Sequence, residues 1–220
     1  MIRIIRSPAD IEEGVVALCA ADPRLDAVHR LCGLPPLRRG AGGFEALASI
    51  IVSQQVSVAS ADAIWSRTRA ALAPFTPAVL AAAPDESFRA GGLSTPKIRT
   101  LRALSRAVLD GLDLSVLEAM RAEEAHAALT SVSGIGPWTA DIYVLTCLGH
   151  ADAFPSGDLA IQEAARLVLG LAARPRAADL LAAAEAWRPW RAVAARLLWS
   201  YYRIAKSGRE GAPTLDGGRG

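Results

Sequence analysis

Two glycines on either side of an isoleucine form the most informative short motif in the sequence. Gly134, Ile135 and Gly136 follow an apolar helical pattern and precede Pro137, a residue type that favours the first position of a helix. Glycine permits the backbone angles that a tight turn between two helices requires. The first amides of the second helix would lack partners within that helix, and such amides can hold an anion such as a phosphate. By itself, however, the motif indicates only a tight turn.

One carboxylate follows this turn at the start of another helical pattern. Asp158 lies 22 residues after Gly136. An aspartate in that position commonly caps the helix by accepting backbone hydrogen bonds. The same carboxylate could stabilise positive charge or activate a water molecule. The residues alone leave both roles open.

The elements that must position these residues are helices. Apolar residues recur at helical spacing, and alternating β-branched runs are absent. We therefore predict an all-α protein, and the chain could divide near the Gly- and Pro-rich residues 32–44. The predicted helices cover residues 8–21, 44–55, 58–72, 76–83, 95–110, 115–120, 123–131, 137–148, 158–169, 176–187 and 190–206.

The composition narrows the class of protein. The chain has 220 residues, 52% of them apolar, which excludes a disordered protein. It has no apolar run long enough to span a membrane and no signal-peptide pattern, so we expect a cytoplasmic protein without membrane contact. The three cysteines and three histidines lack the spacing of a metal site, so we expect no metal and no other cofactor.

The net charge of +2 conceals two basic segments. Residues 87–109 hold five basic residues and residues 188–209 hold six, and neither segment contains an acid. Such segments can be ordinary solvated helix faces, or they can attract nucleic acid.

Five motifs follow one another between about residues 40 and 205. They are Ile50–Ser57 with Ala59, Gly92–Ser94 with Lys97, Gly134–Ala140, Phe154–Pro155 with Asp158, and Trp187–Arg191 with Trp199. In this order they resemble the helix-hairpin-helix DNA glycosylase superfamily and, within it, the 3-methyladenine DNA glycosylase II branch. The chain resembles the short form, which lacks the extra N-terminal α/β domain of some relatives.

The resemblance implies a two-lobed helical fold with a helix-hairpin-helix motif and an active site in the cleft between the lobes. The whole chain, residues 1–220, would be one glycosylase unit. Its central lobe would cover about residues 44–155, and its other lobe would combine the first 40 or so residues with about 156–207. Residues 208–220 would be a flexible tail.

The implied activity is hydrolysis of the N-glycosidic bond of alkylated purines in double-stranded DNA, after base flipping, in base excision repair. The expected substrate is chiefly 3-methyladenine, with 7-methylguanine as a second candidate. Trp138 occupies the position of the Schiff-base lysine of lyase relatives, so we expect no lyase activity. We further expect a monomer, located at the nucleoid if the source is prokaryotic, and a monovalent cation at the hairpin when DNA is bound.

The resemblance also implies roles for individual residues. Asp158 would be the catalytic carboxylate that stabilises an oxocarbenium-like sugar. Gln55, with Gln54 beside it, would fill the gap that the flipped nucleotide leaves. The other expected DNA contacts are Ser57, Lys97, Gly134, Gly136 and Thr139.

The base pocket of such an enzyme would need electron-rich rings to hold a cationic base. At 100° per residue, Trp199 lies opposite Trp190 and the core stripe of its helix, so it is the first candidate for this role. Trp138 and Tyr143 are further candidates. Trp187 and Trp190 are expected in the core.

Two alternatives stay open at this point. The enzyme could prefer another lesion, such as ethenoadenine, hypoxanthine or uracil. The chain could also be a non-catalytic helix-hairpin-helix protein that only binds DNA, although phosphate binding alone would require neither Asp158 nor Trp199.

Overall fold

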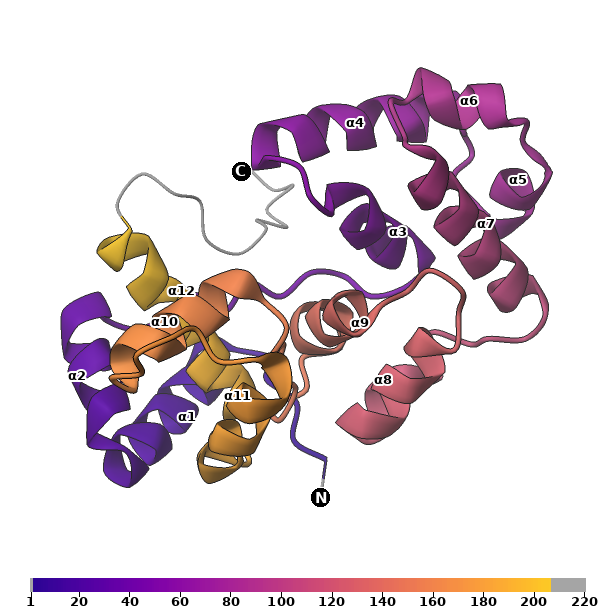
Figure 1. Cartoon of the computed structure of the whole chain (residues 1–220). Helices are drawn as coiled ribbons and strands as arrows, with labels where there is room; N and C mark the ends of the chain where they lie inside the picture. The colour runs from indigo at the N-terminus through magenta and orange to yellow at the C-terminus, as the bar shows by residue number, and fades with distance from the viewer. Residues whose placement is uncertain (1, 207–220) are drawn as a thin grey trace. The chain divides into compact units, whose positions relative to one another are not determined.

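The computed structural model describes residues 2–206, which form a succession of helices (Figure 1). This part of the chain has no β-strand, and one isolated antiparallel bridge joins Ile4 and His150. The predicted all-α fold is therefore confirmed. None of the helices described is both long enough and apolar enough to cross a membrane. The expected tail, residues 208–220, lies outside the described residues.

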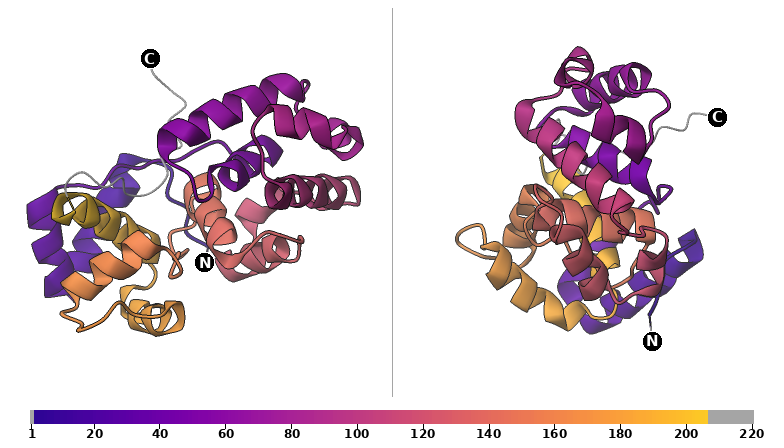
Figure 2. Two further views of the ribbon diagram at one scale, coloured as in Figure 1. Left: turned by 45° about the horizontal axis from the view of Figure 1, so that its top comes forward. Right: turned by 90° about the vertical axis from the view of Figure 1, so that its right-hand side faces the viewer.

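Residues 40–143 form one of two compact units, which we call the hairpin unit. Its elements are α3 (Phe44–Ser53), α4 (Val58–Ala71), α5 (Pro77–Ala82), α6 (Asp85–Ala90), α7 (Thr95–Leu109), the 3-10 helix η1 (Val116–Ala119), α8 (Ala122–Thr130) and α9 (Pro137–Tyr143). Helix α7 packs against α3 and α5, and α9 packs against α3 and α8 (Figures 1 and 2). Apolar residues at helical spacing build the core, as Leu101 and Leu104 of α7 illustrate.

The described residues 2–39 and 144–206 belong to the second unit, the terminal unit. Its elements are α1 (Pro8–Ala21), α2 (Pro23–Cys32), the π-helical η2 (Val144–Leu148), α10 (Leu159–Val168), α11 (Ala177–Ala183), the 3-10 helix η3 (Ala184–Trp187) and α12 (Arg191–Ala205). Helix α12 packs against α1, α2 and α10. This enclosure buries every residue of α12 from Arg191 to Ser200.

The buried surface of α12 differs from the predicted core stripe, because its first turns are buried on all sides and its last turn is not. Ile204 lies at helical spacing from Trp190, on the same stripe, but it is 49% exposed because the last turn of α12 lacks the enclosure of the first turns. Trp187 and Trp190 are buried, as predicted. The indole Nε1 of Trp187 donates a hydrogen bond of 3.0 Å to Asp22 Oδ2.

Two short helices and one boundary differ from the sequence-based expectation. Helices α2 and α6 had not been predicted, although Asp22 before Pro23 is a helix-opening signal, and its carboxylate caps α2 by accepting from Arg24 N at 3.0 Å. Along the chain, the hairpin unit ends at Tyr143 rather than near residue 155, and Val144 begins the second segment of the terminal unit. At that point the backbone changes from α-helical to π-helical geometry.

Candidate active site

Asp158 and Trp199 are in direct contact within the terminal unit. Asp158 is the N-cap of α10, and its Oδ1 accepts hydrogen bonds from the backbone N–H groups of Ala160 and Ile161, each at 3.0 Å. The indole Nε1 of Trp199 donates to the same oxygen at 3.1 Å. Three donors that converge on one oxygen fix the orientation of the carboxylate. Asp158 is therefore both a helix cap and the partner of Trp199.

The surroundings of this pair are largely closed to solvent. Asp158 is 7% exposed and Trp199 is 6% exposed. Trp199 had been expected to point away from the core, but it is buried because neighbouring helices enclose α12. A carboxylate with so little exposure interacts strongly with any charge that develops beside it, because little water is present to screen it.

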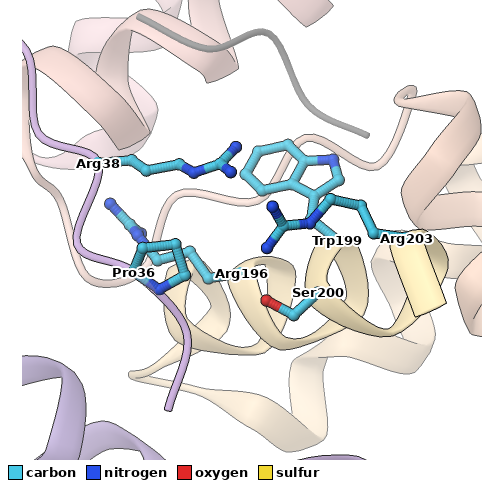
Figure 3. A pocket seen from close by; sticks show the side chains of 6 residues that line it. All are labelled: Pro36, Arg38, Arg196, Trp199, Ser200 and Arg203. Atoms are coloured by element: carbon cyan, nitrogen blue, oxygen red, sulfur yellow. The ribbon is translucent and has the colours of Figure 1, made fainter. Parts of the chain in front are cut away.

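A pocket lies beside the indole of Trp199 (Figure 3). Its lining residues are Pro36, Arg38, Arg196, Trp199, Ser200 and Arg203, all from the terminal unit. Arg38 extends its guanidinium group toward the indole, from a backbone in the left-handed region with φ of 43°. A non-glycine residue keeps that conformation only where its surroundings impose it, and such residues cluster at functional sites.

Arg196 forms the buried wall of this pocket. Its guanidinium group donates to three backbone carbonyls, of Leu37 at 3.1 Å, Ala192 at 3.0 Å and Leu145 at 3.3 Å. Burial, followed by the charges of Arg38 and Arg39, lowers the pKa of Arg196 to about 10. The pocket beside Trp199 is thus rich in positive charge. This feature cannot be predicted from the sequence, because Arg38 and Arg203 are far apart in the chain.

The turn between α8 and α9 uses its two glycines differently. Gly134 has φ of 88°, and a Cβ atom at this position would lie 2.1 Å from Thr100 Oγ1 of α7. At Gly136 a Cβ atom would meet no atom of residues 2–206 within 4 Å. Ile135, between the two glycines, is buried. Gly134 therefore allows the hairpin to pack closely on α7, whereas none of the described residues fills the space at Gly136.

Helices α8 and α9 are also joined by side chains. His126 Nε2 of α8 lies 3.5 Å from Asp141 Oδ1 of α9. Burial lowers the pKa of His126, and a hydrogen bond to the Pro137 backbone opposes this shift. Trp138 is half-buried in the first turn of α9. Asp141 thus links α9 to α8.

The turn between α3 and α4 differs from the prediction. Helix α3 ends at Ser53 instead of continuing to Gln55, because Gln54 is extended and Gln55 is left-handed with φ of 57°. Gln55 is exposed at this turn. Gln54 points inward, and its Nε2 donates to Thr139 Oγ1 of α9. Gln54 is half-buried, and Gln55 is the exposed residue of the pair.

Lys97 had been expected to contact phosphate, but it makes contacts within the protein. Its Nζ donates to the backbone carbonyls of Val52 at 2.6 Å and Gln54 at 2.8 Å. The side chain is half-buried, and burial lowers the pKa of its ammonium group. Lys97 therefore satisfies carbonyls at the C-terminal end of α3, where a cation is favourable.

Three further candidates have structural contacts of their own. Ser57 caps α4, since its side chain accepts from Ser60 N at 3.3 Å. Thr139 is 1% exposed. Tyr143 is fully buried, and its hydroxyl accepts a hydrogen bond from Gly43 N at 2.7 Å. The structure thus places Tyr143 in the core, where its ring has no exposed surface that could line a base pocket.

Several cations of the two basic segments are also used internally. Arg102 donates to Ala83 O at 2.6 Å and to Asp85 Oδ1 at 2.7 Å. Arg188 and Arg191 both bind Asp152, the latter at 2.7 Å between Nε and Oδ1. Asp152 therefore ties the loop before α10 to the start of α12. In residues 2–206 no group of three or more histidine, cysteine, aspartate or glutamate side chains could hold a metal ion.

Residues 48–190 match the HhH-GPD superfamily, whose members are base excision DNA repair proteins. The chain belongs to this superfamily. The matched range contains the hairpin, Gln55 and Asp158, whereas Trp199 lies beyond it. Asp158 thus lies within the region that matches the superfamily, whereas its partner Trp199 lies outside it.

Relatives with curated names support the same placement. DNA-3-methyladenine glycosylase 1 of Schizosaccharomyces pombe is 32% identical over 167 residues, which are 74% of this chain and 73% of that protein. The probable bifunctional transcriptional activator/DNA repair enzyme AlkA of Mycobacterium tuberculosis is 32% identical over 212 residues. Those residues are 90% of this chain but only 41% of the mycobacterial protein. The chain thus spans less than half the length of that relative.

Solved structures of the same superfamily have the same fold. The 3-methyladenine DNA glycosylase of S. pombe, in complex with abasic DNA, gives a TM-score of 0.77 at 26% identity and covers 89% of this chain and 98% of its own. The DNA-3-methyladenine glycosidase of Bacillus halodurans also gives a TM-score of 0.77, at 29% identity and 96% coverage of both chains.

Proposed function

We propose that this HhH-GPD chain is a monofunctional DNA glycosylase that releases alkylated purines, chiefly 3-methyladenine, from double-stranded DNA. One observation carries the proposal: Asp158 Oδ1 lies 3.1 Å from the indole nitrogen of Trp199, beside a pocket in the terminal unit. The carboxylate can stabilise positive charge on the sugar, and the aromatic ring beside it can hold the base. The names of the relatives support the lesion class.

In the proposed reaction the base leaves as a neutral molecule. An alkylated purine such as 3-methyladenine carries a positive charge while it is attached to the sugar, so its departure needs no general acid. Positive charge then moves to the sugar, and the Asp158 carboxylate stabilises it and positions the attacking water. The hydrogen bonds from Ala160, Ile161 and Trp199 hold the carboxylate in place for this role. Rotation of the nucleotide out of the duplex must precede these steps.

The hairpin of α8 and α9 is proposed to grip the DNA backbone. The open space at Gly136 lets a phosphate approach the first amides of α9. The carbonyls of Val132 and Gly136 each accept one hydrogen bond, from Ile135 and Ala140, and each retains a second lone pair. Such carbonyls fit a monovalent cation in the DNA complex. We propose that the enzyme acts as a monomer.

We expect Gly136→Ala to weaken the binding of damaged and undamaged duplexes alike by about tenfold, which corresponds to about 1.4 kcal/mol. The added methyl group fits within the protein but occupies the space that the phosphate would approach. Fluorescence anisotropy with labelled duplexes measures the effect, and thermal unfolding should be unchanged. Gly134→Ala is the matched variant, because its methyl group meets Thr100 and should lower stability instead. Wild-type DNA affinity of Gly136→Ala would contradict the proposed grip.

The protein is expected to cleave no DNA strand and to form no complex that borohydride can trap. Lyase chemistry needs an amine that attacks the sugar, and Trp138 supplies none. The sequence contains two lysines, and Lys97 already donates to two carbonyls. Incubation with abasic DNA and borohydride, followed by denaturing electrophoresis, tests this expectation. A trapped complex formed by protein free of contaminating lyase would show that the enzyme is bifunctional.

The arginines of the pocket favour a second candidate substrate class, uncharged lesions such as ethenoadenine, hypoxanthine or uracil. The guanidinium groups of Arg38, Arg196 and Arg203 would repel a cationic base on the Trp199 ring, whereas they would not repel an uncharged one. The same guanidinium groups could instead face the phosphates of the extruded nucleotide. Comparison of release rates for 7-methylguanine and ethenoadenine in the same duplex decides between the two classes.

The decisive experiment is incubation of the purified protein with methylated duplex DNA, followed by chromatography of the released bases. The proposal predicts free 3-methyladenine in the soluble fraction and an alkali-sensitive abasic site in the DNA. Heat-inactivated protein controls for spontaneous depurination. If wild-type protein releases no base from methylated or ethenoadenine-containing DNA, the proposed enzyme activity is wrong and a DNA-binding role remains.

A further inference from the structure

We propose that Lys97 is a positioning residue that holds Gln55 ready to enter the DNA stack. This inference rests on the proposed glycosylase function and on the role of Gln55 as the inserted residue. It replaces the expected contact between Lys97 and phosphate. All residues of the argument belong to the hairpin unit.

Gln55 has a backbone conformation that needs support. Its φ of 57° lies in the left-handed region, which residues other than glycine rarely adopt. Its side chain is exposed, so burial of this side chain does not supply the support. Surrounding contacts must therefore hold the turn between α3 and α4 in this shape.

Contacts of the neighbouring residues provide this support. Lys97 Nζ bridges the carbonyls of Val52 at 2.6 Å and Gln54 at 2.8 Å. The side-chain Nε2 of Gln54 donates to Thr139 Oγ1 in the first turn of α9. The residue directly before Gln55 is thus held at its carbonyl by α7 and at its side chain by α9.

Helix α7 also supports the hairpin. Thr100 follows Lys97 by three residues, which places both on one face of α7. Thr100 packs against Gly134 so closely that a Cβ atom there would lie 2.1 Å from Thr100 Oγ1. One face of α7 therefore holds both the turn that carries Gln55 and the hairpin that is proposed to grip phosphate.

This arrangement assigns a specific function to Lys97. With the hairpin bound to the backbone, a firmly held turn presents Gln55 to the duplex without further ordering of the chain, which lowers the cost of base extrusion. Loss of Lys97 should therefore slow extrusion while DNA affinity is retained. Because its ammonium group is engaged by carbonyls, its loss should remove no phosphate contact.

The test compares Lys97→Met with wild type on one lesion, 7-methylguanine or ethenoadenine, whichever the wild type releases. The lesion stands either in a normal pair or opposite a tetrahydrofuran abasic site, where extrusion is easy. We expect the single-turnover rate to fall about tenfold in the normal pair, equivalent to about 1.4 kcal/mol, and to change less than about twofold opposite the abasic site. Lys97→Arg, which can donate to the same carbonyls, should restore most of the rate.

Two further measurements separate positioning from phosphate binding. The slope of log affinity against log salt concentration should be unchanged in Lys97→Met, whereas loss of a phosphate contact would reduce it by about one. Arg106→Met removes the same charge from an exposed position of α7 and serves as the control. The effects of Lys97→Met and Gln55→Ala should not add in the double variant, because both act at one step.

The outcomes distinguish this inference from the proposed function. If the wild type releases no base from methylated or ethenoadenine-containing DNA, the proposed function fails. If the wild type is active and Lys97→Met loses activity equally on both substrates, or its effect adds to that of Gln55→Ala, the positioning role is wrong. A reduced salt slope would restore the phosphate contact that the sequence had predicted.

Discussion

Asp158→Asn is expected to lower the rate of base release by about 10³-fold while the protein stays folded. The substitution removes the negative charge that stabilises the developing sugar cation, and loss of one such electrostatic contact in an active site typically has an effect of this order. Geometry should be preserved, because all three donors from Ala160, Ile161 and Trp199 point to Oδ1, which an asparagine carbonyl can replace. Asparagine is also a good N-cap. Single-turnover kinetics on methylated duplex measure the change.

Asp22 provides a matched control for this experiment. It too is the N-cap of a helix and accepts a hydrogen bond from an indole nitrogen, that of Trp187. Hydrogen bonds from the Arg24 side chain, then from Trp187, lower the pKa of Asp22 to about 2 against the opposing effect of burial. Its charged form therefore stabilises the fold above pH 4, and this stabilisation is lost as the pH falls toward 2.

Asp22→Asn should accordingly reduce the free energy of unfolding at neutral pH and leave the rate of base release per folded molecule unchanged. Asp158→Asn should show the opposite pattern. A rate for Asp158→Asn close to that of wild type would remove Asp158 from the mechanism and leave it only the role of a helix cap.

Local sequence signals predicted the features that depend on short stretches of chain. The helix that opens at Ser7 and Pro8 has the predicted bounds, and Ser7 forms a capping box with Asp10. The hairpin turn was predictable because Gly134 permits the backbone angles of the turn and Pro137 favours the start of a helix, and neither effect depends on distant residues. Asp158 also occupies its predicted position before α10.

Features that depend on contacts between distant segments could not be predicted. Lys97 appeared as a free cation in an acid-free segment, and only the fold reveals the carbonyls 43 and 45 residues earlier that it binds. The same applies to Arg196, whose donors reach a carbonyl 159 residues away. Formal charge in a sequence does not distinguish a cation at the surface from one that satisfies buried carbonyls.

Trp199→Leu is expected to lower kcat/KM for a cationic lesion by about 100-fold or more. The substitution removes the aromatic face, worth about 2 kcal/mol for a desolvated cation, and the hydrogen bond to Asp158, worth about 1.5 kcal/mol as a bond to a charged group. Trp199→Phe keeps an aromatic face and should lose only about tenfold. Affinity for undamaged duplex should change less than about twofold in both variants, because the hairpin lies in the other unit.

Trp187→Phe separates the pocket role of Trp199 from the general cost of altering a buried tryptophan. Trp187 is buried in the same unit, and its indole also donates to an aspartate, Asp22, at 3.0 Å. Its loss should lower the thermal unfolding midpoint without changing kcat/KM of the folded fraction. If Trp199→Phe and Trp187→Phe behave alike, or if Trp199→Leu weakens undamaged DNA binding as strongly as base release, Trp199 is a structural residue. A selective loss of base release would instead show that its ring holds the base and that its indole nitrogen orients the carboxylate.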